Sequence, residues 1–257
     1  TNILDRDSGL VLFCGAVGHG KTTSIASFLN EINRTQNKHI ITLEDPIEYM
    51  YTSKKSFVEQ RERGSHFKSF EQGLVDALRQ TPDVILVGEL REKDIMRQTL
   101  RIAEAGVLVF GTMHAGSAEE ALYRVINSFP LESQEMVRTQ LSATLVAVVV
   151  QELVMREDLG FRVPRLSILR GTQAVKNTLR DNKLALIDSV MEMGTEDDMY
   201  TFARYEKDFL ADKNNFVPPS VSFKASSGPP SQTPNKSRLV DYATLEEAPP
   251  SEHIIIN

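Results

Sequence analysis

The amino-acid sequence predicts a three-layer α/β fold with a mainly parallel sheet. The first observation is that apolar, strand-like runs alternate with segments of helical apolar spacing from the start of the chain to about residue 190. The second is a glycine-rich turn at residues 15–20, which joins the first of these strands to the first of these helices. Because such alternation connects parallel strands through crossover helices, we expect a layered sheet covered by helices.

Five apolar runs are the expected strands of this sheet: 10–14, 39–43, 84–87, 107–112 and 165–168. Six segments are the expected helices: 22–34, 69–80, 92–104, 117–127, 133–155 and 173–180. The apolar run Ala143–Val150 is compatible with a strand or with a buried helix, and the long helical lead-in from Ser133 favours the helix. A small helical region is expected from about residue 171.

The composition is that of an ordinary globular chain, and its charge counts against a general nucleic-acid binder. The 257 residues are 41% apolar and 25% charged, with a formal net charge of −6, whereas nucleic-acid-binding domains are usually basic. The sequence has neither a signal peptide nor an apolar run long enough to span a membrane. Its low cysteine content is typical of a reducing compartment, so a cytoplasmic location is expected. Cys14 is the only cysteine, which excludes a disulfide framework and a cysteine zinc cluster.

Residues 214–257 differ in composition from the rest of the chain. Seven of the eleven prolines lie in residues 214–257, where apolar periodicity is lost. A segment of this composition cannot bury enough apolar surface to order itself, so we expect one domain at 1–213 and a disordered Pro/Ser-rich tail at 214–257.

Because the chain starts at Thr1 rather than Met, close to a core strand, we also expect it to be a fragment that lacks an N-terminal part.

Residues 15–22 match a phosphate-binding pattern at every position. The segment GAVGHGKT fits G-x-x-x-x-G-K followed by Ser or Thr, and it lies between an expected strand and an expected helix. This arrangement aims backbone N–H groups and the positive end of a helix at one point, which suits a polyphosphate. Lys21 is expected to reach the β- and γ-phosphates, and the Thr22 hydroxyl to bind Mg²⁺. The expected nucleotide-binding residues are Gly15, Gly18, His19, Gly20, Lys21, Thr22 and Thr23.

Acidic residues follow two of the expected strands. TLEDPIE at 42–48 places three carboxylates at a strand end, beside the phosphate loop, although a solvated acidic turn would have the same sequence. VILVGELR at 84–91 is a buried strand that ends in Glu89, like a Walker B element with Glu in place of Asp. Glu89 is expected to hold Mg²⁺ through water, and Glu44 to polarise the attacking water, with Glu89 as the rival for that second role.

Two further groups are candidates for contact with the γ-phosphate. Thr112 and His114 alternate at the end of the strand 107–112, and His114 is expected to sense the γ-phosphate through a hydrogen bond that hydrolysis removes. Arg61 and Arg63 lie in an expected polar loop, from which they would act as arginine fingers across a subunit boundary. A structural histidine and a solvated loop with paired charges are the simpler alternatives.

Four blocks, in this order, resemble the secretion ATPase superfamily. GAVGHGKT, TLEDPIE, ILVGELR and GTMHAGSA correspond to its Walker A, Asp box, Walker B and His box, and the linking segment LRQTPD at 78–83 also matches. The resemblance covers roughly residues 5–210. It implies a P-loop NTPase domain of the RecA-like type that binds ATP and Mg²⁺ and hydrolyses ATP.

Within this superfamily the chain looks most like the twitching-motility retraction ATPases, the PilT family. Assembly ATPases usually carry a tetracysteine zinc insertion, which a chain with one cysteine cannot have. GTQAVKNTLRD at 171–181 is partly similar to the helix GTPAIRNLIRE of the retraction family. The resemblance implies a homohexamer with ATP between subunits, a platform protein in the inner membrane as partner, and a PAS-like N-terminal domain that is missing here.

The expected function is therefore ATP-driven retraction of a type IV pilus, at the cytoplasmic side of the inner membrane. A type IV secretion or conjugation ATPase of the Dot/Icm kind shares the same motifs. A DNA-translocating motor is a rival of another class, and the acidic net charge counts against it. A nucleotide-binding regulator that does not hydrolyse ATP is the third alternative.

Overall fold

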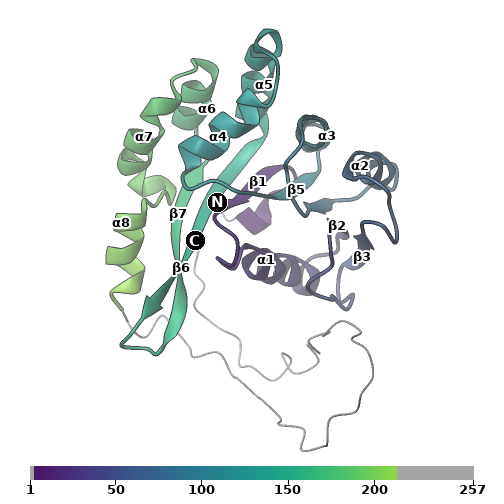
Figure 1. Cartoon of the computed structure of the whole chain (residues 1–257), viewed down its shortest axis with the longest axis horizontal. Coiled ribbons are helices and arrows are strands. Elements are labelled where there is room, and N and C mark those ends of the chain that lie inside the picture. The colour runs from purple at the N-terminus through teal and green to yellow at the C-terminus, as the bar shows by residue number, and fades with distance from the viewer. Residues whose placement is uncertain (1–2, 213–257) are drawn as a thin grey trace, which may run out of the picture.

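A seven-stranded sheet forms the centre of the protein (Figure 1). The computed structural model describes residues 3–212. The strand order is β3-β2-β4-β5-β1-β6-β7, in which β7 runs antiparallel to β6 and all other neighbouring pairs are parallel. The strands are β1 (Gly9–Cys14), β2 (His39–Glu44), β3 (Phe57–Glu62), β4 (Val84–Val87), β5 (Leu108–Met113), β6 (Leu145–Arg156) and β7 (Phe161–Arg170).

Helices cover both faces of the sheet, which confirms the three-layer fold. On one face, α1 (Lys21–Thr35) packs Ile25, Leu29 and Ile32 into one apolar core. The second core lies on the opposite face, under α2 (Phe70–Leu78), α3 (Lys93–Glu104), α4 (Ala118–Asn127) and α5 (Leu131–Thr144). Alternate residues of the central strands enter opposite cores, as in β1, where Leu10 and Leu12 face the second core and Val11 faces the first.

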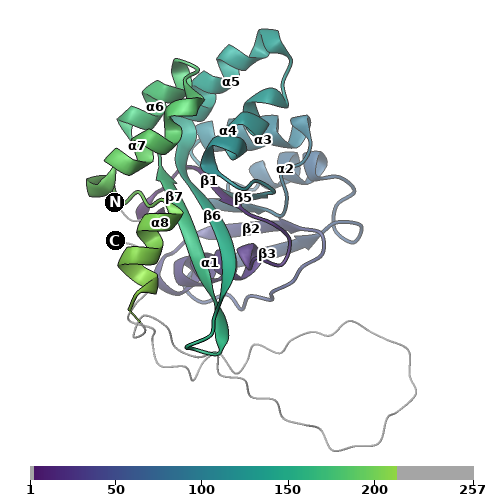
Figure 2. The same cartoon turned by 60° about the vertical axis from the view of Figure 1, so that its left-hand side comes forward.

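Short helices follow the sheet and lie along β6 and β7 (Figure 2). They are α6 (Gln173–Arg180), α7 (Ile187–Met193) and α8 (Phe202–Tyr205), and α8 continues into a π-helical turn at Glu206–Leu210. Three 3₁₀ turns complete the described elements: Ile3–Asp5, Leu184–Leu186 and Thr195–Asp197. The predicted tail at 214–257 lies outside the described residues.

The expected helix at 133–155 is wrong in its second half. Helix α5 ends at Thr144, and β6 begins at Leu145 and runs to Arg156. The segment Leu145–Gln151 is fully buried because it inserts between β1 and β7, where β-branched valines pack well against neighbouring strands. Periodicity cannot separate a buried strand from a buried helix in such a run, so the position in the sheet decides.

Strand β3 is not among the expected strands, and the interpretation of residues 60–64 as a loop is wrong for 60–62, which include Arg61. Arg61 lies inside β3 and pairs in register with Leu43 of β2. Four of the six residues of β3 are polar or charged, which hides its strand character in the sequence. Such a composition is usual for a strand at the edge of a sheet, because charged side chains there discourage pairing with another chain.

Candidate nucleotide-binding site

A cavity of about 720 Å³ opens where the phosphate loop meets the ends of β2, β4 and β5. Its size is typical of a small-molecule site, and the carboxyl ends of parallel strands are where α/β folds usually bind ligands. The structure thus brings all four predicted motifs to one place. The lining includes residues 17–23 of the phosphate loop and α1, Glu44, Asp45 and Glu48, then Gly88 and Glu89, and finally Thr112 and His114.

Gly15, Gly18 and Gly20 of the phosphate loop all have a positive φ, which only glycine adopts easily. Gly15 has a φ of 141°, and a Cβ atom there would lie 2.3 Å from the backbone oxygen of Gln151. Gly20 has a φ of 78° and caps α1 without a side-chain hydrogen bond, whereas Ser69 caps α2 through its hydroxyl. The first N–H groups of α1 therefore have no side-chain acceptor, and a bound anion would satisfy them.

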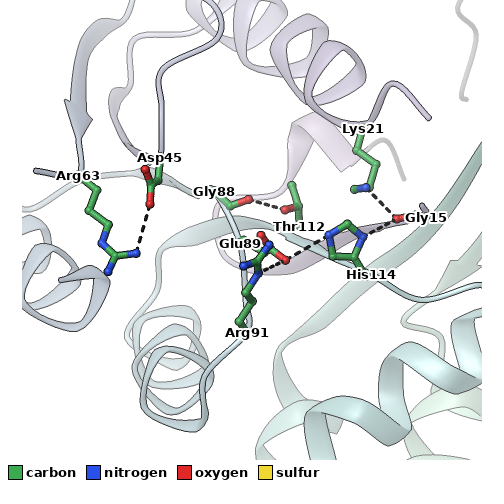
Figure 3. Close-up of polar contacts among 9 residues, drawn as sticks. All are labelled: Gly15, Lys21, Asp45, Arg63, Gly88, Glu89, Arg91, Thr112 and His114. Atoms are coloured by element: carbon green, nitrogen blue, oxygen red, sulfur yellow. Dashed lines mark hydrogen bonds and ion pairs between the residues drawn. The ribbon is translucent and has the colours of Figure 1, made fainter. Parts of the chain in front are cut away.

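Lys21 places its ammonium group inside the loop (Figure 3). Its Nζ atom donates hydrogen bonds to the carbonyls of Gly15, at 2.7 Å, and Ala16, at 2.9 Å. Burial lowers the pKa of Lys21, because the cation loses water there. The partly desolvated Lys21 ammonium and the uncapped N–H groups at the start of α1 together form a set of donors that fits a polyphosphate.

Glu44 is a buried carboxylate at the end of β2. Only 5% of its surface is exposed, and its Oε1 accepts a hydrogen bond of 2.7 Å from the Thr42 hydroxyl and a longer one from Gln60. Burial raises the pKa of Glu44, and the hydrogen bonds oppose that rise only in part. Glu44 is therefore better suited to take up a proton near neutral pH than an ordinary carboxylate would be.

The raised pKa of Glu44 predicts that this carboxylate costs stability once it is ionised. The stability that the protonated form contributes is present below the unfolded pKa of 4.5 and is lost as the pH rises through the higher folded pKa. Glu44→Gln is therefore expected to raise the free energy of unfolding at pH 8, with a gain that shrinks towards pH 4. Urea denaturation at several pH values measures this, and a Glu44→Gln variant that is less stable than the parent at pH 8 would contradict it.

Glu89, Arg91 and His114 form a linked group at the edge of the cavity (Figure 3). Oε1 of Glu89 lies 2.5 Å from Nε of Arg91 and 3.3 Å from Nε2 of His114. The other ring nitrogen of His114 lies 3.2 Å from the carbonyl oxygen of Gly15. His114 thus connects the phosphate loop to Glu89, while Thr112 donates its hydroxyl to the Gly88 carbonyl at the end of β4.

The two predicted arginine fingers lie in different places. Arg63 follows β3, lines the cavity and pairs with Asp45 at 3.2 Å (Figure 3). Arg61 has a side chain that is only 11% exposed, pairs with Glu59 at 2.6 Å and lines a second cavity, which also includes Asp76 of α2. The structure therefore brings Arg63, but not Arg61, to the predicted phosphate site of its own subunit.

Gln151 is a residue of this site that the sequence did not suggest. Its side chain lies behind the phosphate loop and bonds both to the His19 carbonyl, at 2.8 Å, and to the Ser24 hydroxyl, at 2.7 Å. A single polar residue after a run of buried valines would be a signal for such a role, but the assignment of this segment to a helix obscured it. Another side-chain hydrogen bond, of 2.6 Å, joins Thr23 in the first turn of α1 to the Tyr49 hydroxyl.

The fold and the site define a P-loop nucleotide-binding protein. The chain belongs to the family of type II/IV secretion system proteins, whose model matches residues 1–202. It is 44% identical to a twitching motility protein of Neisseria gonorrhoeae over 199 residues, which are 77% of this chain and 53% of that protein. The chain therefore spans about half the length of this curated relative.

Solved structures of related ATPases share the fold. A crystal structure of the pilus retraction motor PilT with bound ADP superposes with a TM-score of 0.72 and 45% identity, over 74% of this chain and 55% of that one. The ATPase DotB of Legionella pneumophila superposes with a TM-score of 0.67 and 26% identity, over 82% of this chain and 62% of that one. Among residues 3–212, no helix is both long and apolar enough to cross a membrane.

Proposed function

We propose that this chain is the ATP-hydrolysing part of a motor that retracts a type IV pilus. The observation that carries the proposal is the convergence of the phosphate loop, Glu44, Glu89 and His114 on one cavity. The similarity to a twitching motility protein and to a pilus retraction motor supports the choice of pilus retraction. The expected partners are five further copies of the chain and a platform protein of the inner membrane, at whose cytoplasmic side the motor would act.

The phosphate loop and Lys21 are proposed to hold the nucleotide. Backbone N–H groups at the start of α1 would donate to the phosphate oxygens, and Lys21 would exchange its two carbonyl partners for phosphate. The Thr22 hydroxyl and the Glu89 carboxylate both line the cavity and are the hard oxygen ligands that Mg²⁺ prefers. When bound, Mg²⁺ would neutralise charge on the phosphates.

Glu44 is proposed to orient and deprotonate the attacking water, with Glu89 as the rival. Burial raises the pKa of Glu44, and Thr42 fixes its carboxylate in position, as a general base requires. Glu89 instead lies in a charged pair with Arg91, which favours its role as a metal ligand. In this scheme Glu44 would accept the proton from water, and Glu89 would help to hold Mg²⁺.

His114 is proposed to sense the γ-phosphate, and Arg63 to act as an arginine finger across a subunit boundary. His114 bridges Gly15 and Glu89, so a change at the phosphates would reach both the loop and Glu89 through one ring. Arg63 is half-exposed at the cavity, and its partner Asp45 is half-exposed too, so this pair could open towards a neighbouring subunit. Opening and closing of subunits in a ring would then convert hydrolysis into motion.

A secretion ATPase of the Dot/Icm kind is the second candidate, because DotB shares the fold over more of this chain than PilT does. The identity of 45% with PilT against 26% with DotB favours pilus retraction.

A gene replacement in the source bacterium tests the proposal. Cells in which the gene encodes the Lys21→Ala variant should still assemble pili but should not retract them. Surface pili should therefore accumulate, and twitching should stop. Unchanged twitching together with a loss of protein secretion would support the Dot/Icm alternative instead.

A further inference from the structure

Gln151 occupies a buried position directly behind the phosphate loop. It follows Val150, the last residue of β6 that pairs with β1, and only 2% of its surface is exposed. Both ends of its side-chain amide are used: Nε2 donates to the His19 carbonyl and Oε1 accepts from the Ser24 hydroxyl. One side chain of β6 thus ties together the loop and the first turn of α1.

The bond to the His19 carbonyl determines where the next N–H group points. In a planar trans peptide, the C=O of one residue and the N–H of the next point in opposite directions. Because the His19 carbonyl is held against Gln151, the N–H of Gly20 must point away from β6. The N–H groups of a phosphate loop bind phosphate only when they point at it together.

We propose that Gln151 is a positioning residue that keeps the His19–Gly20 peptide in the orientation that binds phosphate. This inference rests on the proposed nucleotide-binding function. The packing is close enough to leave little freedom, since a Cβ atom on Gly20 would lie 3.0 Å from Nε2 of Gln151. Without a Cβ, a glycine backbone by itself permits either sign of φ, and Gly20 has a φ of 78°, so the side-chain bond to the His19 carbonyl selects this one orientation of the peptide.

The matched test replaces Gln151 by a side chain of similar length that cannot donate a hydrogen bond. Gln151→Met is expected to weaken ADP binding by about tenfold to a hundredfold, the value of one well-aimed hydrogen bond to a charged group. Calorimetry on the full chain measures the affinity. Glu152→Gln, which alters the adjacent residue and its pair with Arg165, is the control and should bind ADP like the parent.

A second readout separates positioning from simple loss of stability. With ¹⁵N-labelled glycine, the Gly20 amide signal of the parent should shift strongly when ADP is added, and in Gln151→Met this shift should be much smaller. Ser24→Ala keeps the bond to His19 and should lose less affinity than Gln151→Met. Should Gln151→Met not fold, Gln151→Asn, whose amide is too short to reach His19, is expected to show the same loss.

The outcomes distinguish this inference from the proposed function. A parent chain that does not bind ADP would remove the proposed function and this inference with it. A parent that binds ADP, together with a Gln151 variant of equal affinity and equal Gly20 shift, would overturn the role of Gln151 alone.

Discussion

Replacement of Lys21 by alanine is expected to abolish nucleotide binding and to leave the fold intact. The Lys21 ammonium contacts two loop carbonyls and faces the cavity, and no apolar core includes it. Its charge-assisted hydrogen bonds to phosphate would be lost, which predicts an affinity for ATP analogues at least about a hundredfold lower. Calorimetry with a non-hydrolysable analogue measures the loss.

Lys183→Ala is the matched control for this prediction. Lys183 is an exposed lysine that pairs with Asp181 at 3.2 Å and does not line the cavity, so its removal should leave affinity unchanged. Equal thermal stability of the two variants would confirm that the fold survives. An affinity of Lys21→Ala equal to that of the parent would place the nucleotide elsewhere.

Replacement of Glu89 by glutamine is expected to stop turnover while ATP still binds. Glutamine keeps the shape of the side chain and can still accept from Arg91, but it loses the negative charge beside His114. The loss of a metal-binding or water-polarising carboxylate predicts a fall in kcat of about a hundredfold to ten-thousandfold. Phosphate release under saturating ATP measures this, and analogue binding should stay within about threefold of the parent.

The parallel variant Glu44→Gln separates the two carboxylates. If Glu44 is the base, both variants lose turnover, but only Glu89→Gln should also raise the Mg²⁺ concentration needed for half-maximal binding of the analogue. Glu104→Gln, at the far end of α3, serves as the control and should keep the parent rate. A parent rate in Glu44→Gln would exclude Glu44 from the chemistry and leave Glu89 as the base.

Most of the sheet and the cavity could be predicted from sequence because both depend on local patterns. Short apolar runs bounded by polar turns identified β1, β2, β4 and β5 to within about one residue at each end. Since the strands are parallel, their carboxyl ends meet at one edge, and this brought Glu44, Glu89 and His114 to the loop. The glycine pattern at 15–22 identified the phosphate loop, in which the structure gives Gly15, Gly18 and Gly20 a positive φ.

The features that the sequence did not reveal depend on long-range neighbours. Most residues of β3 are polar, and its strand conformation depends on pairing with β2. The strand conformation of β6 likewise depends on its place between β1 and β7. The contact between Gln151 and His19 joins residues 132 positions apart in the chain. No local pattern encodes such a contact, so only the assembled sheet reveals it.

A crystal structure of the chain with Mg²⁺ and a non-hydrolysable ATP analogue would test directly whether the phosphate loop binds the nucleotide. We expect the β-phosphate to lie against the N–H groups of Gly20 and Lys21, and the Lys21 ammonium to leave the carbonyls of Gly15 and Ala16 for phosphate. We also expect Mg²⁺ beside Thr22, with Glu89 in reach through water. A nucleotide bound outside the cavity, or a loop in which Lys21 keeps its carbonyl partners at saturating analogue, would show that this loop is not the nucleotide-binding site.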